Sequence, residues 1–177
     1  SSAASVCIRD SIKTCREAHI RPIMLTGDNL ATALAIGKEV GICTSDDEGI
    51  NASDLNNLKP REVMEYVSKY SVFARVSPEN KVQIVKALQK MGKVVAMTGD
   101  GVNDAPAMKL ANVGVGMGKS GTDVTKNVAD MVLADDNFAT IVSAVEEGRK
   151  IYDNIRKAIQ FLLASNLSEV VSIFVAT

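Results

Sequence analysis

The sequence predicts an α/β fold in which a parallel sheet is covered by helices on both faces. Short apolar runs of strand length alternate along the chain with segments of helical period, which is the pattern of such a sheet. Two of these runs lead into the same triplet, Thr-Gly-Asp, at residues 26–28 and 98–100. Ligands of parallel sheets bind beyond the carboxyl ends of the strands, so both triplets lie where a binding site is expected.

The first half of the chain is expected to contain one strand, with helices before and after it. The expected elements are a helix over residues 5–18, a strand over 22–25, a helix over 30–40, a loop over 44–60 and a short helix over 61–68. The second of these helices follows from the helical spacing of Leu34, Ala35 and Lys38, and Gly41 suits its C-cap. The loop follows from its Asp, Asn and Gly content.

The second half is expected to hold four more strands and, besides a helix that opens at Asn103 and Asp104, two further helices. The strands are expected over residues 72–76, 94–97, 113–116 and 131–133, and the helices over 77–92 and from 138 into the tail. Ser77, Pro78 and Glu79 are helix start signals: a hydroxyl cap, a proline at the first position and an acid in the first turn. The continuously apolar run over 94–97 predicts a strand buried on both faces.

The composition predicts a packed core and excludes some partners. Hydrophobic residues make up 46% of the 177 residues and charged residues 23%, as in a globular domain with an appendage. The net charge is −1, there is no Trp, and aromatic residues are only 4% of the chain. A basic patch with stacking aromatics is therefore absent from the sequence, and no nucleic-acid partner is expected.

The densest chemical signal is the string Thr-Gly-Asp-Gly-Val-Asn-Asp-Ala-Pro at residues 98–106. Two glycines flank Asp100 and allow a sharp turn close to a ligand. Asn103 and Asp104 are expected to open a helix with Pro106 in its first turn. Carboxylates with an amide suit Mg²⁺, which binds through one or two carboxylates plus a phosphate. The alternative is an Asp-Gly turn followed by a helix cap, which needs fewer polar groups than this string holds.

The other triplet, Thr26-Gly27-Asp28, offers a hydroxyl and backbone amides near a helix N-terminus, where a phosphoryl oxygen can bind. Capping of the next helix by Asp28 or Asn29 explains the triplet equally well.

Two cations are further candidates. Lys81, near the start of a helix, can reach the same sheet edge and neutralise phosphate charge, although a helical lysine is more often a solvated surface residue. Arg75 lies in an apolar strand, which is less expected of a surface residue, and is a candidate for nucleotide contact.

Together these segments resemble the haloacid dehalogenase superfamily and, within it, the P-type ATPases. The resemblance rests on residues 24–29, 73–81 and 97–106, covers nearly the whole chain, and is most specific in the last string. It implies a Rossmann-like phosphorylation domain in which Asp100 binds Mg²⁺ and Lys81 contacts an aspartyl phosphate. It implies that Asn103 and Asp104 shape the phosphate and nucleotide site, and that Arg75 binds nucleotide. The first triplet, Thr26, Gly27 and Asp28, is implied to touch the phosphoryl group and nucleotide. The resemblance implies Lys81, Thr26 and Asp104 as the catalytic residues, with ATP as the substrate.

The chain departs from that family by what it lacks. The sequence has no Asp-Lys-Thr-Gly-Thr motif, which carries the family's nucleophile, and no nucleotide-binding domain. Residues 1–10 also lack the usual Asp-Pro-Pro-Arg stretch. We therefore expect a fragment with an incomplete sheet that forms no phosphoenzyme by itself.

The C-terminal tail predicts a partial transmembrane helix. Residues 159–177 carry one charge, that of Glu169, and a membrane span needs about 20 such residues. Asn166 and Glu169 lie three apart, on one face of a helix. Residues 165–171 resemble the fifth transmembrane helix of sarcoplasmic-reticulum-type Ca²⁺ pumps, which implies that this pair binds Ca²⁺. An interhelical hydrogen bond, or transport of Na⁺, K⁺ or H⁺, is the alternative.

The expected protein is thus part of an ATP-driven cation pump. Residues 1–147 would form the partial phosphorylation domain and residues 148–177 a stalk and partial transmembrane helix, with residues 1–150 on the cytosolic side. The basic stalk over residues 149–157 agrees with the positive-inside rule. The expected partners are ATP, the transported cation, the lipid bilayer and the remainder of the pump. The alternatives are a phosphatase of the same superfamily and a non-catalytic truncated pump that binds a partner.

Overall fold

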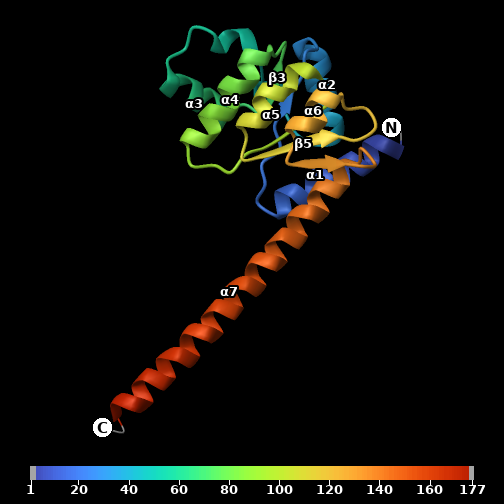
Figure 1. Ribbon diagram of the computed structural model, residues 1–177. Helices are drawn as coiled ribbons and strands as arrows, with labels where there is room; N and C mark the ends of the chain where they lie inside the picture. Colours follow the sequence, from blue (N-terminus) through green and yellow to red (C-terminus); the bar gives the residue numbers. More distant parts are fainter. Residues whose placement is uncertain (1–2, 176–177) are drawn as a thin grey trace. The chain divides into compact units, whose positions relative to one another are not determined.

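The computed structural model describes residues 3–175 and divides into one unit up to Ala139 and a second from Thr140 onward (Figure 1). The helices of the first unit are α1 (Ala3–Glu17), α2 (Leu30–Val40), α3 (Pro60–Lys69), α4 (Pro78–Lys90), α5 (Ala105–Leu110) and α6 (Asp123–Val128). Its strands are β1 (Met24–Leu25), β2 (Gly49–Asn51), β3 (Val72–Ala74), β4 (Ala96–Gly99), β5 (Val113–Met117) and β6 (Met131–Leu133). Three short 3-10 helices, η1 (Asp46–Glu48), η2 (Ala52–Leu55) and η3 (Val102–Asp104), join them.

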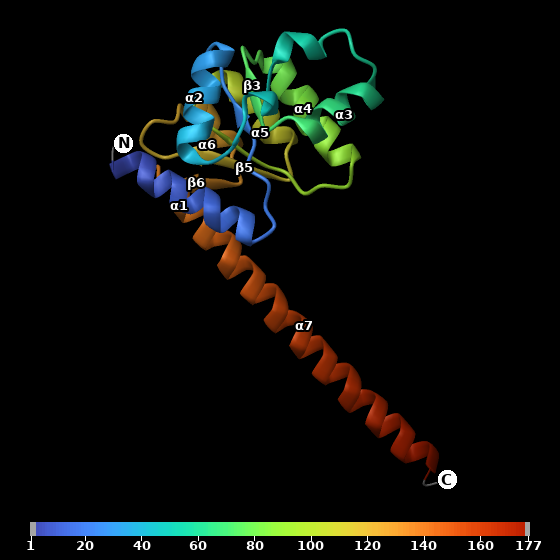
Figure 2. The ribbon, with the colours of Figure 1, turned by 180° about the vertical axis from the view of Figure 1, so that it is seen from behind.

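The strands pair in parallel throughout, which confirms the predicted fold class. Hydrogen bonds arrange them in two three-stranded sheets with the orders β1-β3-β2 and β4-β5-β6. β5 and β6 are seen side by side in Figure 2. In this arrangement β1 and β4, the two strands that lead into the Thr-Gly-Asp triplets, are both edge strands.

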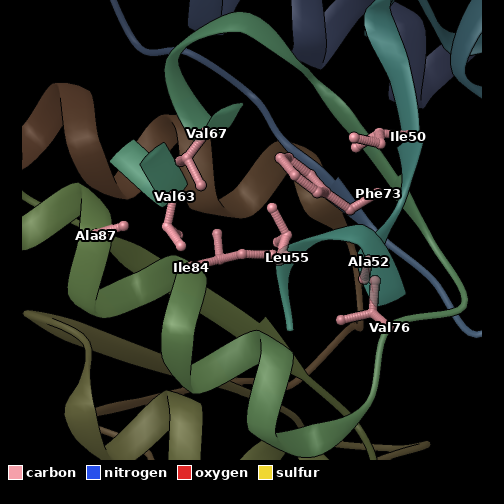
Figure 3. Close-up of a cluster of buried hydrophobic side chains, with 9 residues drawn as sticks. All are labelled: Ile50, Ala52, Leu55, Val63, Val67, Phe73, Val76, Ile84 and Ala87. Atoms are coloured by element: carbon pink, nitrogen blue, oxygen red, sulfur yellow. The ribbon is translucent and has the colours of Figure 1, made fainter. Parts of the chain in front are cut away.

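The central strand β3 is buried on both faces by helices from two sides. Phe73 packs against apolar residues of α3 and α4, the cluster drawn in Figure 3. Val72 and Ala74, which alternate with it, pack against residues of α1 and α2. All three side chains are fully buried, and burial of each larger one stabilises the fold by about 1.5–3 kcal/mol. The predicted coverage of the sheet by helices is therefore confirmed here.

Glycines let α5 and α6 lie close to the second sheet. A Cβ on Gly114 would lie 2.9 Å from the carbonyl oxygen of Met108 in α5, and a Cβ on Gly116 would lie 3.2 Å from Cβ of Ala129, just after α6. Side chains at these two positions of β5 would push the helices away from the strand.

Helix start and stop signals are confirmed at the predicted residues. Asn29 Oδ1 accepts a hydrogen bond from Thr32 N–H at the start of α2, and Gly41 ends that helix with φ 82°. Ser77 Oγ accepts from Asn80 N–H at the start of α4, with Pro78 as the first helical residue. Residues 30–40 form a helix with the predicted bounds.

Five segments differ from the prediction, three of which are in strands or helices too short or too strained to predict. Residues 44–60, expected to be a loop, contain β2, which pairs with β3 through only three residues and is too short to show a strand pattern. α6 was not expected because six residues are too few to reveal a helical period. The strand expected over 72–76 ends at Ala74, since Arg75 adopts φ 51°.

The run at residues 94–97 is also placed differently. β4 begins two residues later, at Ala96, and the side chain of Val94 is 83% exposed. The predicted burial on both faces is wrong for Val94 and Ala96, because Val94 precedes the strand and β4 lies at a sheet edge. The strand expected over 22–25 is likewise reduced to its last two residues.

The described residues of the second unit, 140–175, all lie in one helix. α7 (Phe138–Val175) runs without interruption for 38 residues, which confirms the long C-terminal helix. Within residues 3–175 it is the one helix whose length and composition suit a membrane span, with a mean hydropathy of 1.6 over 18 residues. The functional boundary expected between residues 147 and 148 stays a prediction.

Hydrogen bonds to the side chain of Asp136, a residue that follows β6, hold the loop after β5 in place. The Asp136 carboxylate accepts hydrogen bonds from the backbone N–H groups of Lys119 (2.9 Å) and Ser120 (2.7 Å). Asp136 itself has φ 55°, a left-handed conformation that aspartate tolerates better than most residues. The backbone donors, Lys119 first, lower the pKa of Asp136 from 3.8 to about 2.

We predict that Asp136→Asn removes the pH-dependent contribution that the Asp136 carboxylate makes to the free energy of unfolding. Because the folded pKa lies below the ordinary value, the charged carboxylate contributes its full stability above about pH 5 and loses it as the pH falls toward the folded pKa. The difference in Tm between the chain and the variant, measured in detergent, should therefore be largest near neutral pH and shrink toward about pH 3. Asp54→Asn, at an exposed site outside this loop, is the control. A Tm difference that stays constant with pH would contradict this role of Asp136.

Candidate functional site

The predicted site residues of the first unit gather at the carboxyl ends of β1, β3 and β4. Thr26 directly follows β1, Arg75 directly follows β3, and Gly99 ends β4. Lys81 lies in the first turn of α4 and pairs with Asp104 at the end of η3. The carboxyl ends of strands in both three-stranded sheets thus carry predicted site residues, and the Lys81–Asp104 pair joins α4 to the loop after β4.

The first triplet forms a compact hydrogen-bonded turn. Thr26 Oγ1 donates to Asp28 Oδ2 (3.0 Å) and accepts from Asp28 N–H (3.2 Å). The cap of α2 is Asn29, so helix capping accounts for Asn29 but not for Asp28. The Asp28 carboxylate is exposed, and it orients the hydroxyl that was predicted to bind a phosphoryl oxygen.

The residue after β3 is held beside this turn in a strained conformation. Arg75 N–H donates to the carbonyl oxygen of Asp28 (2.9 Å), and Val76 N–H donates to that of Thr26 (3.0 Å). The φ of 51° at Arg75 costs about 1–3 kcal/mol, which these flanking bonds offset. The result is an exposed guanidinium group on a residue fixed directly beside the Thr-Gly-Asp turn.

Asp104 organises the second triplet. It is 7% exposed, and its Oδ2 accepts hydrogen bonds from the backbone N–H groups of Asp100 (3.3 Å) and Gly101 (3.2 Å). Its Oδ1 forms an ion pair with Lys81 Nζ. One carboxylate therefore shapes the loop after β4 and ties that loop to α4.

The ion pair is largely removed from solvent. The side chain of Lys81 is 15% exposed and that of Asp104 is 9% exposed. Lys81 is therefore not the solvated surface lysine that the sequence left open. Removing one partner of such a pair leaves an uncompensated charge and typically costs about 3–5 kcal/mol.

The metal prediction is supported by the donor types but not by a complete ligand set. Asp100 and Asn103 are both exposed in the loop that follows β4 and offer one carboxylate and one amide oxygen. Residues 3–175 contain no cluster of three or more His, Cys, Asp or Glu side chains that would hold a metal ion. Mg²⁺ keeps several waters and takes few protein ligands, so Asp100 fits as one ligand of an ion whose other oxygens come from elsewhere.

Sequence reasoning missed two residues that support this site. Thr122 N–H donates to the carbonyl oxygen of Asp100 (3.0 Å), and Asn80, next to Lys81, is buried with its amide fully hydrogen-bonded. The cap pattern Thr122-Asp123 was a signal for α6, although a weak one for so short a helix. The signal for Asn80 was its place three residues after the Ser77 cap.

The remaining predicted residues, Asn166 and Glu169, lie in α7, in the second unit. Both are exposed and three residues apart on one unbroken helix, as predicted. Their role as cation ligands stays a prediction.

Comparison with known proteins agrees with the family resemblance that the site residues indicate. Residues 8–112 match the model of the haloacid dehalogenase-like hydrolase family. The chain is similar to Calcium-transporting ATPase 1 of Bacillus cereus, with 54% identity over 169 residues that cover 96% of this chain and 19% of that protein. It is also similar to P-type sodium-transporting ATPase4 of Toxoplasma gondii, with 50% identity over 183 residues that cover 97% of this chain and 14% of that protein.

A solved structure shares the fold. The crystal structure of a zinc-transporting PIB-type ATPase superposes with a TM-score of 0.65 and 32% identity, covering 85% of this chain and 20% of the other. The chain thus spans between 14% and 20% of the length of these two curated relatives and of this structure.

We predict that the two triplet glycines differ in their tolerance of a methyl group. A Cβ on Gly99 would lie 2.8 Å from both Asp104 Cγ and Met108 Sδ, whereas a Cβ on Gly27 would meet nothing within 4 Å. Gly99→Ala must displace Asp104 and should lower the free energy of unfolding by about 1–3 kcal/mol. Gly27→Ala, the matched control, should change it by less than about 1 kcal/mol. Denaturant unfolding of both variants measures the difference, and equal effects would contradict the placement of Asp104 against Gly99.

Proposed function

Because the chain belongs to the haloacid dehalogenase-like hydrolase family, and is similar over nearly its whole length to cation-transporting P-type ATPases, we propose that it forms most of the phosphorylation domain of an ATP-driven cation pump. The observation that carries the proposal is that both Thr-Gly-Asp triplets lie at the carboxyl ends of parallel strands, and that the loop after the second triplet is joined to the start of α4 by the Lys81–Asp104 ion pair. Helix α7 would be the stalk and the beginning of a transmembrane helix.

In the proposed reaction an aspartate outside these 177 residues attacks the γ-phosphorus of ATP, and ADP leaves. Water later attacks the aspartyl phosphate and releases inorganic phosphate, which makes catalysis covalent and two-step. The Thr26 hydroxyl, the amides of residues 26–28 and the Lys81 ammonium group would stabilise the charge of the phosphoryl group. Asp100 would hold Mg²⁺, which neutralises phosphate charge when bound.

The exposed edges of the two sheets suit an additional strand. β1 and β4 are edge strands, and Leu25 of β1 packs both against the cluster around Phe73 and against the cluster around Met97 of β4. We propose that the strand carrying the nucleophilic aspartate pairs with both edges. Its carboxyl end would then lie between the carboxyl ends of β1 and β4, which would bring the nucleophile close to Thr26 and Asp100.

The transported ion is proposed from α7. Asn166 and Glu169 supply an amide and a carboxylate oxygen on one helix face, and such hard donors suit Ca²⁺. An ionisable residue within a membrane span is a functional candidate by default. The relatives include calcium-transporting and sodium-transporting ATPases at 54% and 50% identity, so the choice of Ca²⁺ rests on this donor pair.

The membrane arrangement is proposed on charge. Arg149, Lys150, Arg156 and Lys157 precede the apolar part of α7, which by the positive-inside rule places residues 1–150 on the cytosolic side. ATP, the lipid bilayer and the remainder of the pump are the proposed partners.

The test is acid-stable phosphoenzyme formation in the intact protein that contains this chain. Labelling from γ-labelled ATP should require micromolar free Ca²⁺, and Glu169→Gln should raise the required concentration by about tenfold or more, because a charged ligand is lost. Glu146→Gln, on the same helix but outside its apolar part, is the matched control and should leave the Ca²⁺ dependence unchanged.

The possible results separate the parts of the proposal. Labelling that depends on another cation would keep the pump and overturn Ca²⁺ as the ion. Absence of acid-stable labelling under every cation tested would overturn the proposed enzyme.

A further inference from the structure

The start of α4 is held by an amide that does not belong to the candidate site. Asn80 is 3% exposed, and its Oδ1 accepts hydrogen bonds from Ser77 Oγ (3.0 Å) and Ser77 N–H (3.3 Å). Its Nδ2 donates to Asn56 Oδ1 (2.7 Å) and, at longer range, to Gln83 Oε1 (3.5 Å). The amide therefore joins the cap of α4 to the residue that follows η2.

The orientation of the Asn80 amide is fixed by its neighbours. The Ser77 N–H group is a donor only, so the atom that faces it must be the oxygen of Asn80. The nitrogen then has to face Asn56 and needs an acceptor there. Since Asn80 is buried, loss of that acceptor would leave its nitrogen with only the longer contact to Gln83 Oε1 (3.5 Å).

The rest of α4 is held by apolar packing. Ile84 packs in the cluster of Figure 3 together with Leu55 of η2, and Val85 packs in the cluster around Met97. A second amide, that of Gln83, donates to the carbonyl oxygen of Leu55 (3.2 Å). Side-chain hydrogen bonds from Asn80 and Gln83 thus join the first two turns of the helix to Asn56 and Leu55. Near the end of the helix, Gln89 donates to the carbonyl oxygen of Leu110.

We propose that Asn80 is a positioning residue for Lys81, acting with Asn56. Asn80 directly precedes Lys81, so a movement of the first turn of α4 displaces the Lys81 Cα atom and with it the ammonium group that pairs with Asp104. Lys81 has four rotatable bonds and a large conformational entropy, which a fixed starting point reduces. This inference rests on the proposed function, in which Lys81 stabilises the phosphoryl group.

The amide pair offers a non-additive test. In Asn80→Asp, one oxygen still accepts from Ser77, and the Asn56 amide can turn over to donate to the other oxygen. In Asn56→Asp, the new carboxylate still accepts from Asn80 Nδ2. In the double variant Asn56→Asp/Asn80→Asp, two carboxylates replace a pair now 2.7 Å apart and repel each other.

The readout is the affinity of orthovanadate, a mimic of the phosphoryl-transfer transition state, measured by isothermal titration calorimetry on the intact protein. Asn56→Asp and Asn80→Asp should each bind vanadate within about threefold of the parent, and the facing double variant about tenfold or more weakly. The matched control is Asn57→Asp/Asn80→Asp, which adds the same charge but does not place two carboxylates opposite each other at residues 56 and 80. It should bind vanadate within about threefold of the parent. Asn56→Ala, which removes the acceptor without adding charge, is the second variant and should weaken binding in the same direction if the facing pair does not fold.

The Lys81→Met background decides between positioning and general destabilisation. If the pair acts through Lys81, the facing double variant should weaken vanadate binding no further once Lys81 is replaced. A loss that persists in that background would overturn the inference, as would unchanged binding in both the facing double variant and Asn56→Ala. Phosphoenzyme formation by the parent is measured alongside: its absence would overturn the proposed function itself, whereas labelling by the parent with unaffected variants would overturn only the role of Asn80.

Discussion

The ion pair between Lys81 and Asp104 is the interaction on which the candidate site depends. The two sheets of the first unit are not joined by strand hydrogen bonds, so the relative placement of their carboxyl ends is set by helix packing and by this pair. Asp104 also accepts from the amides of Asp100 and Gly101, so the same carboxylate holds the loop that carries the predicted metal ligand. A displacement of Asp104 would therefore move both the Lys81 ammonium group on α4 and the loop that follows β4.

Around this pair, apolar side chains and polar side chains stabilise different parts of the fold. Apolar side chains such as Phe73 and Val85 fix the bodies of the strands and helices. Side chains that accept backbone N–H groups fix the loops: Thr26 for the first triplet, Asp104 for the second, and Asp136 for the loop after β5. That third loop ends at Thr122, whose N–H bonds the carbonyl oxygen of Asp100. The loops at the site are thus positioned by local polar bonds, each of which a single substitution can remove.

Much of this arrangement was predictable from the sequence, because it depends on local signals. Cap residues predicted the starts of α2 and α4 closely, and the two Thr-Gly-Asp triplets marked the carboxyl ends of β1 and β4, where predicted site residues lie. The missed features depend on contacts distant in sequence. β2 has three residues and is stabilised by pairing with β3, and the left-handed conformation of Arg75 is held by bonds to residues 26–28. The ion pair was beyond reach for the same reason, since 23 residues separate its partners.

The unpaired edges of β1 and β4 have a consequence for handling the chain as a separate molecule. Each edge presents backbone N–H and C=O groups that another extended segment can use, and such edges are common starting points for aggregation. The edges are short, two and four residues, which limits but does not remove this tendency. The same edges also make the chain a natural acceptor for a synthetic peptide that supplies a parallel strand. Complementation of this kind would be a means of assembling the proposed phosphorylation site from two pieces.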